Sequence, residues 1–175
     1  MSLDTLRETL PAYAKDLSLN LSSLANETTL SDQQKWGAFL ASAHAVGQPG
    51  VVAAVAAAAT AGGLSAQAAD AAKAAAAIMA MNNVYYRATH LLSNPEYRTL
   101  PARLRMNGLA NPGVERADFE LWCTAVSAVN GCGACLDSHE GELKKHGLTA
   151  PQIQAALRIA AVVNAVSRVV QAEAA

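Results

Sequence analysis

The segment DFELWCTAVSAVNGCGACLDSHEGELKKHG, residues 118–147, predicts two α-helices joined by a tight turn. The first helix covers about residues 118–129 and ends at Asn130-Gly131, because a glycine just beyond the last turn tolerates the left-handed conformation of a helix C-cap. The second helix begins at Cys132 and stops near Gly147. The chain is therefore expected to contain a helical hairpin whose second helix starts on a Cys-x-x-Cys pair.

Helix signals recur through the rest of the chain and indicate an all-α protein. Ser31 with Gln34, and Thr149 with Gln152, have the spacing of capping boxes, and Ser65 can cap a long alanine-rich helix. Runs of alternating β-branched and aromatic residues, which would indicate strands, are absent from the sequence. The helices expected from these signals cover about residues 3–17, 31–47, 51–61, 65–92, 118–129 and 132–145, with a last one from 149 onward.

Three stretches are expected to interrupt the helices. Pro11 should kink or break the first one, because it lacks an N–H and crowds the preceding turn. Residues 20–29 are predicted to form a polar loop. Residues 97–113 contain several prolines and glycines and are predicted to be an irregular connector with one short helical piece.

Length and composition favour one compact domain over residues 1–175. A chain of 175 residues can bury a substantial core. Its residues are 52% hydrophobic but only 5% aromatic, and much of the apolar content is alanine, which favours helices in close contact.

Charge and apolar runs exclude several function classes. The formal net charge is −1 and the basic residues are scattered, so no nucleic-acid partner is expected. The apolar runs at 51–59 and 74–81 are shorter than the ~20 residues of a membrane span, and the last helix carries Arg158 and Arg168, so no membrane span is expected. The first residues lack the basic start and apolar run of a secretory signal, which favours a cytoplasmic location.

The Cys132-x-x-Cys135 pair is the feature most suited to chemistry. Cysteines in a chain without a secretory signal are better explained as reactive or metal-binding than as structural crosslinks. In the first turn of a helix their Cα atoms lie about 5 to 5.5 Å apart, within disulfide range. The positive end of the helix dipole also favours a thiolate, the form that attacks peroxides and disulfides.

His139 and Glu120 can assist the thiols. His139 follows Cys135 by one helical turn, so its imidazole lies on the same face and could take the thiol proton. Glu120 and His139 lie roughly 15 and 12 Å along the helix from the Asn130-Gly131 turn, so the hairpin brings them almost level. The pattern predicts a proton relay from Cys135 through His139 to Glu120. It leaves open which sulfur attacks first, since the dipole favours Cys132 and the base favours Cys135.

The pattern Glu120, Cys132-x-x-Cys135, His139 in an all-helical chain resembles the alkyl hydroperoxide reductase D (AhpD) proteins of the carboxymuconolactone decarboxylase-like superfamily. The resemblance extends to the segments at residues 76–84, 105–107 and 119–122, so it covers most of the chain. One departure is Ala134, where members of the family often carry a histidine.

The resemblance implies an AhpD-like helical subunit in a homotrimer, with antioxidant hydroperoxidase activity and a role as thiol-disulfide adaptor. Cys135 would form the sulfenic acid and the mixed disulfide with a peroxiredoxin partner, AhpC, while Cys132 would be proton donor and resolving disulfide partner. Electrons would come from dihydrolipoamide on a lipoylated dihydrolipoamide acyltransferase, and ultimately from NADH. No tightly bound cofactor is implied.

Other functions suit the same residues less well. Cys132, Cys135 and His139 could ligate zinc together with Cys123 or Glu120 in a non-enzymatic module, but a second ligand pair at metal spacing is missing. A decarboxylase or lactone-processing relative of the same superfamily would need a base and an enolate-stabilising site in place of two thiols. Two buried structural cysteines are a further alternative. Cys123 itself is expected to be a core residue.

Overall fold

The computed structural model describes residues 2–174, and these form ten α-helices, one short 3-10 helix and no strand. The expected all-α fold class is confirmed. The helices are α1 (Leu3–Glu8), η1 (Ala12–Ala14), α2 (Lys15–Ala25), α3 (Asp32–Val46), α4 (Pro49–Ala61), α5 (Ala66–Leu91), α6 (Glu96–Thr99), α7 (Asn107–Ala110), α8 (Arg116–Asn130), α9 (Gly133–Lys145) and α10 (Ala150–Glu173).

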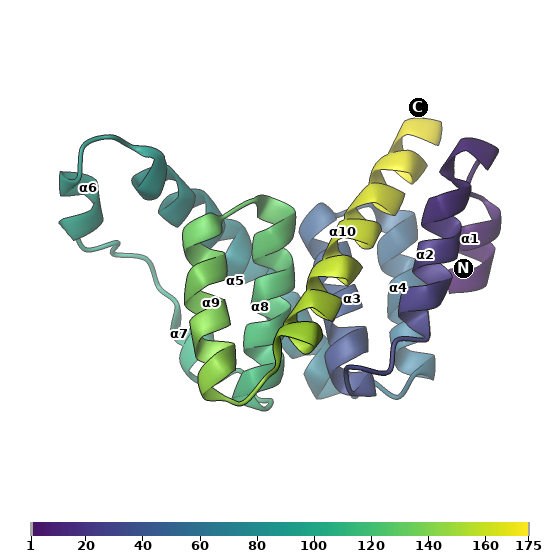
Figure 1. Ribbon diagram of the computed structural model, residues 1–175, viewed down its shortest axis with the longest axis horizontal. Helices are drawn as coiled ribbons and strands as arrows, with labels where there is room; N and C mark the ends of the chain where they lie inside the picture. Colours follow the sequence, from purple (N-terminus) through teal and green to yellow (C-terminus); the bar gives the residue numbers. More distant parts are fainter. Residues whose placement is uncertain (1, 175) are drawn as a thin grey trace.

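Helix α3 is the centre of the bundle and contacts α4, α5, α8 and α10. The α8–α9 hairpin and α5 lie on one side of it, and α1, α2 and α4 lie on the other, next to both chain ends (Figure 1). Helix α10 crosses between these two groups and packs on α2, α3, α4 and α8. The chain between α5 and α8 projects away from the body as an extended connection that carries α6 (Figure 1).

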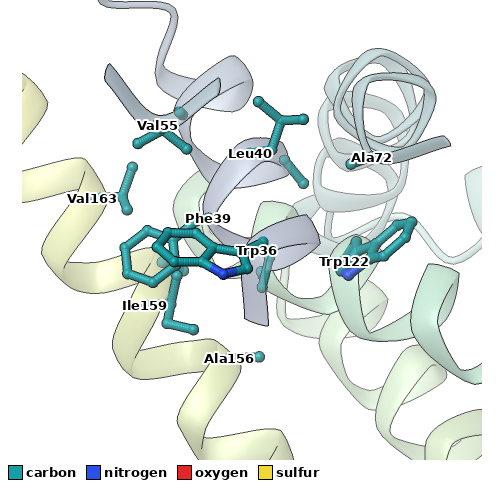
Figure 2. Close-up of a cluster of buried hydrophobic side chains, with 14 of the residues drawn as sticks. Trp36, Phe39, Leu40, Val55, Ala72, Trp122, Ala156, Ile159 and Val163 are labelled. Carbon is teal, nitrogen blue, oxygen red and sulfur yellow. The ribbon is translucent and has the colours of Figure 1, made fainter. Parts of the chain in front are cut away.

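The core is formed by a few large side chains among many alanines. Trp36 and Phe39 of α3 lie beside Val55 of α4 and Ile159 of α10, and Trp122 of α8 lies on the opposite side of α3 (Figure 2). The indole of Trp122 packs directly against the backbone of α3 at Gly37, where an added Cβ would lie 2.1 Å from the ring. Because glycine has no side chain, α3 and α8 can approach this closely. The helix contacts are as close as the alanine-rich composition predicts.

Most helix ends form as the sequence predicts. Ser31–Gln34 and Thr149–Gln152 make their capping boxes, and the Ser65 hydroxyl accepts the Ala68 N–H at 3.1 Å. Gly131 ends α8 in the left-handed conformation, with φ of +67°. This turn reverses the chain and places the start of α9 beside the end of α8.

The predicted loop at residues 20–29 is wrong in its first half, because α2 continues to Ala25. Leu21 and Leu24 are three residues apart and buried, so they share the inward face of α2. The polar residues around them lie towards the outward side of the same helix. Burial of two leucines therefore outweighs the polar composition.

The first helix is also shorter than predicted. It ends at Glu8 and is followed by the 3-10 turn Ala12–Ala14 after Pro11, which confirms the expected break. In the connector between α5 and α8 the structure has two one-turn helices, α6 and α7, where the sequence predicts one. Short turns of this kind lack the apolar periodicity that identifies longer helices.

Within residues 2–174, α10 alone is long and apolar enough to cross a membrane, judged by length and composition. In the fold, Ile159, Val163 and Val166 of this helix are buried, and the helix packs on α3 and α8. This packing accounts for its apolar composition.

Candidate active site

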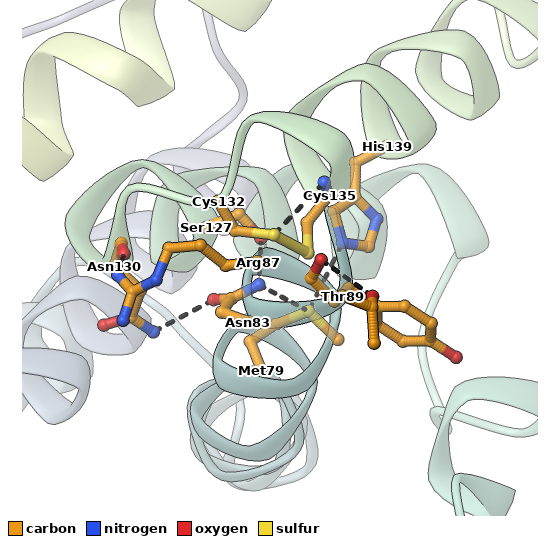
Figure 3. The surroundings of a disulfide bond; sticks show 10 residues. Met79, Asn83, Arg87, Thr89, Ser127, Asn130, Cys132, Cys135 and His139 are labelled. Carbon is orange, nitrogen blue, oxygen red and sulfur yellow. Dashed lines mark hydrogen bonds between the residues drawn. A yellow bond between two sulfur atoms is a disulfide. The ribbon is translucent and has the colours of Figure 1, made fainter. Parts of the chain in front are cut away.

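The CxxC pair lies at the start of α9, immediately after the turn that ends α8. Cys132 is the N-cap residue of α9, so the helix begins at Gly133, one residue later than predicted. The Cys132 sulfur accepts the Cys135 N–H at 3.3 Å. The two sulfurs form a disulfide, and the Cα atoms are 5.3 Å apart, as the first-turn geometry predicts (Figure 3). The pair can therefore close and open within one helical turn.

The two cysteines differ in their access to the surroundings. Cys132 is fully buried, whereas Cys135 is 7% exposed and lines a cavity of about 280 Å³ between α5, α7 and α9. His139 lines the same cavity. A small molecule that enters the cavity reaches the sulfur of Cys135 before that of Cys132.

The predicted pairing of Glu120 with His139 is present. The Nδ1 atom of His139 lies 2.6 Å from a carboxylate oxygen of Glu120, and both side chains are largely buried. A carboxylate at Nδ1 favours the tautomer that carries its proton on this nitrogen, which leaves Nε2 as the basic atom. In this disulfide form the Nε2 atom contacts the Met79 sulfur at 3.3 Å. The sequence did not indicate Met79 as a neighbour of the imidazole.

Arg116 completes the environment of Glu120. Its guanidinium lies 2.5 Å from the second carboxylate oxygen and also donates to the Leu109 carbonyl of α7. One side chain therefore contacts both the Glu120 carboxylate and the α7 segment that contributes Leu109 to the cavity wall. Sequence analysis did not single out Arg116, although its spacing of four residues from Glu120 on one helix is a signal that could have indicated this ion pair.

A polar network fixes the turn before Cys132. The Asn83 amide of α5 donates to the Ser127 hydroxyl at 2.9 Å and accepts from the Asn130 amide at 2.9 Å, and Arg87 donates to the Asn130 carbonyl (Figure 3). The Cys132 N–H donates to the Ser127 carbonyl at 3.1 Å. Helix α5 thus holds the turn that presents the CxxC pair. Sequence analysis missed this network, because α5 is distant from the hairpin along the chain.

Cys123 is a core residue, as expected. It is fully buried, and burial together with the nearby Glu120 carboxylate raises the pKa of its thiol well above the usual value. At neutral pH it stays protonated, a form that reacts slowly.

The structure does not support the alternative of a zinc-binding module. Residues 2–174 contain no group of three His, Cys, Asp or Glu side chains placed to hold a metal ion. Ala134, the position of the departure from the family pattern, lines the cavity beside Cys135.

A helical bundle with a CxxC disulfide at a helix start and a paired histidine beside it is typical of the class of thiol-dependent oxidoreductases. Residues 95–175 match the carboxymuconolactone decarboxylase family. A Maricaulis maris (strain MCS10) protein named alkyl hydroperoxide reductase AhpD is 67% identical over 173 residues, which cover 99% of each chain. A protein of the same name from Hyphomonas neptunium (strain ATCC 15444) is 66% identical, over 100% of this chain and 97% of its own.

The chain therefore belongs to the AhpD family of the carboxymuconolactone decarboxylase-like superfamily. It is an antioxidant oxidoreductase of the alkyl hydroperoxide reductase type.

Proposed function

We propose that the protein reduces hydroperoxides at Cys135 and relays electrons as a thiol-disulfide adaptor. The single observation that carries this proposal is the unequal placement of the two cysteines: Cys135 lines the cavity beside His139, while Cys132 is buried behind it and bonded to it. An attacking sulfur must meet the substrate, and a resolving sulfur needs to meet only its partner.

The reaction begins when the Cys135 thiol transfers its proton to His139 and becomes a thiolate. The Glu120 carboxylate stabilises the protonated imidazole. The thiolate attacks the terminal oxygen of the hydroperoxide, the O–O bond breaks, and the alkoxide leaves with a proton from Cys132. The products are an alcohol and a sulfenic acid on Cys135. Cys132 then attacks this sulfur, water leaves, and the disulfide forms.

The disulfide must then be reduced by an external dithiol. We propose that dihydrolipoamide on a lipoylated dihydrolipoamide acyltransferase supplies the two electrons, which come ultimately from NADH through dihydrolipoamide dehydrogenase. The reduced protein passes them to a peroxiredoxin, AhpC, through a mixed disulfide at Cys135. The protein itself holds no cofactor in this scheme, and the chemistry suits the reducing cytoplasm.

A coupled assay tests the whole sequence. NADH oxidation is followed with dihydrolipoamide dehydrogenase, a lipoylated domain, AhpC and tert-butyl hydroperoxide, with and without this protein. We expect NADH oxidation that depends on the protein and is abolished by Cys135→Ser. An equal rate with the Cys135→Ser variant would refute the role of this thiol, and an unchanged rate without the lipoylated domain would refute the electron source.

We also propose that three chains associate as a homotrimer. The support is an arm, residues 91–105, which comprises the end of α5, α6 and the extended chain after it and projects from the body (Figure 1). Its side chains Leu91, Leu92, Tyr97 and Leu100 are between 44% and 75% exposed. Exposed apolar side chains gathered on one segment are typical of a surface that is covered in an assembly.

The decarboxylase alternative is less well supported, although the superfamily carries that name. Such a reaction would need a base and an enolate-stabilising site in place of two thiols, whereas this cavity is lined by a cysteine of a disulfide-bonded CxxC pair.

A further inference from the structure

One buried polar group in the cavity has no partner. Asn82 of α5 is 4% exposed and lines the cavity together with Cys135 and His139. Its side-chain oxygen is buried and has no hydrogen-bond partner among residues 2–174. Such groups are rare in folded proteins, because losing water without a replacement hydrogen bond is unfavourable.

The neighbouring asparagine shows the contrast. Asn83 is also buried, but both ends of its amide are used, towards Ser127 and Asn130. Asn83 therefore has a structural task and Asn82 does not. Asn82 lines the same cavity as Cys135, and no residue among 2–174 uses its side-chain oxygen.

The rest of the cavity wall indicates the ligand. Met79, Met106, Leu109 and the Tyr86 ring supply apolar surface around the polar group. A hydroperoxide matches this arrangement, because it joins an apolar tail to an –O–O–H group with one donor and two acceptor oxygens. The carboxamide of an asparagine has one oxygen that accepts hydrogen bonds and an NH2 group that donates two, so it can pair with both parts of the –O–O–H group.

We propose that Asn82 binds the –O–O–H group of the substrate and aims its terminal oxygen at Cys135. The carboxamide oxygen accepts the O–H of the terminal oxygen, and the amide N–H donates to the oxygen that carries the tail. When the thiolate attacks, negative charge develops on that second oxygen, where the amide donor stabilises it. This inference rests on the proposed reaction at Cys135 and adds the group that holds the substrate.

The test uses pre-reduced protein mixed with tert-butyl hydroperoxide or hydrogen peroxide, with disulfide formation followed in a single turnover. We expect Asn82→Leu to lower the second-order rate by roughly 10- to 100-fold, the usual effect of losing hydrogen bonds at a reacting oxygen. Both peroxides should slow by a similar factor, because both present the –O–O–H group. Asn20→Leu, the same exchange on the exposed face of α2, is the matched control and should leave the rate unchanged.

Two further measurements separate substrate binding from a structural role. Alkylation of Cys135 by iodoacetamide needs no peroxide contact, so its rate should be unchanged in Asn82→Leu. The midpoint of urea unfolding should stay the same or rise, because the exchange removes an unpaired polar group. Asn82→Ala should lower the peroxide rate by the same factor. It replaces the leucine variant in the assay if that variant does not fold, because alanine is well tolerated in an alanine-rich helix.

The outcomes are distinct. Peroxide rates within twofold of wild type in both variants would overturn the role of Asn82. A parallel fall in the alkylation rate would overturn it too, since Asn82 would then act on the thiol. If the wild-type protein forms no disulfide with peroxide, the proposed reaction at Cys135 fails instead.

Discussion

The two sulfurs of the CxxC pair are chemically alike but have different surroundings. Cys132 is the N-cap of α9 and fully buried, while Cys135 opens onto the cavity. The third cysteine, Cys123, is buried in α8, and burial raises the pKa of its thiol. The three thiols should therefore react at three different rates.

Limiting iodoacetamide added to reduced protein at neutral pH should modify Cys135 first, Cys132 more slowly and Cys123 only after unfolding. Accessibility sets the order of the first two, and the raised pKa of Cys123 keeps its thiol protonated. Peptide mass spectrometry at successive times measures the order. Modification of Cys123 in the folded protein at the rate of Cys135 would contradict it.

The Glu120–His139 pair should matter for proton transfer more than for stability. Glu120→Gln keeps the shape of the side chain but removes the charge that pairs with His139 and Arg116. We expect hydroperoxide turnover to fall by about 100-fold, the lower range for loss of acid–base catalysis, and His139→Phe to have a similar effect.

The control for this prediction is Glu142→Gln on α9, because Glu142 pairs only with exposed basic side chains and should leave turnover unchanged. Circular dichroism checks that each variant keeps its helices. Full turnover in Glu120→Gln would remove the carboxylate from the mechanism.

Sequence spacing could identify the residues of the hairpin but not those of α5. Glu120, Cys132, Cys135 and His139 lie within 20 residues, so helical periodicity and the tight turn bring them together. Asn82 comes from a helix whose position beside α9 depends on tertiary packing. Two adjacent asparagines in an alanine-rich helix carry no signal of what each side chain will contact.

At the scale of helices, the contact between α3 and α8 depends on a missing side chain. A Cβ at Gly37 would lie 2.1 Å from the Trp122 ring, and Trp122 is fully buried. The indole also donates to the Gln34 carbonyl at 3.2 Å, so it has little freedom to shift.

Gly37→Ala should therefore destabilise the protein by about 1–3 kcal/mol, the usual effect of overpacking a core. The matched control is Gly141→Ala in α9, where an added Cβ meets no atom within 4 Å. This control should gain roughly 0.5–1 kcal/mol from its higher helix propensity. Urea unfolding measures both, and equal stability of the two variants would contradict the close contact.

Helix boundaries were predictable where a cap marks them and less so elsewhere. The Ser31 and Thr149 capping boxes gave the starts of α3 and α10, and Gly131 gave the end of α8. The end of α2 was missed because its polar residues look like a loop. Its helical state depends on Leu21 and Leu24 being buried, and contacts between distant helices are not visible in local sequence.

At the scale of the whole molecule, the arm is the part that the single chain leaves uncovered. Leu91 at its base is 75% exposed, although it ends the long helix that lines the active site. Covering such a leucine in an assembly contributes about 1.5–3 kcal/mol per chain.

Leu91→Glu should therefore weaken the proposed homotrimer, because it would place a charge in the apolar interface. Analytical ultracentrifugation should show a shift from three chains towards one. The control is Leu19→Glu on α2, a leucine that is 55% exposed and lies outside the arm. If both variants sediment as the wild type does, the arm is not the contact surface.

The burial of Cys132 has a practical consequence for identifying physiological partners. A mixed disulfide at Cys135 is normally short-lived, because the neighbouring thiol displaces the partner from behind. In a Cys132→Ser chain that displacement cannot occur, and the closed packing around position 132 keeps other thiols out by the same route. Such a chain would act as bait: proteins that exchange with it in a cell extract would stay covalently attached and could be released for identification by dithiothreitol alone.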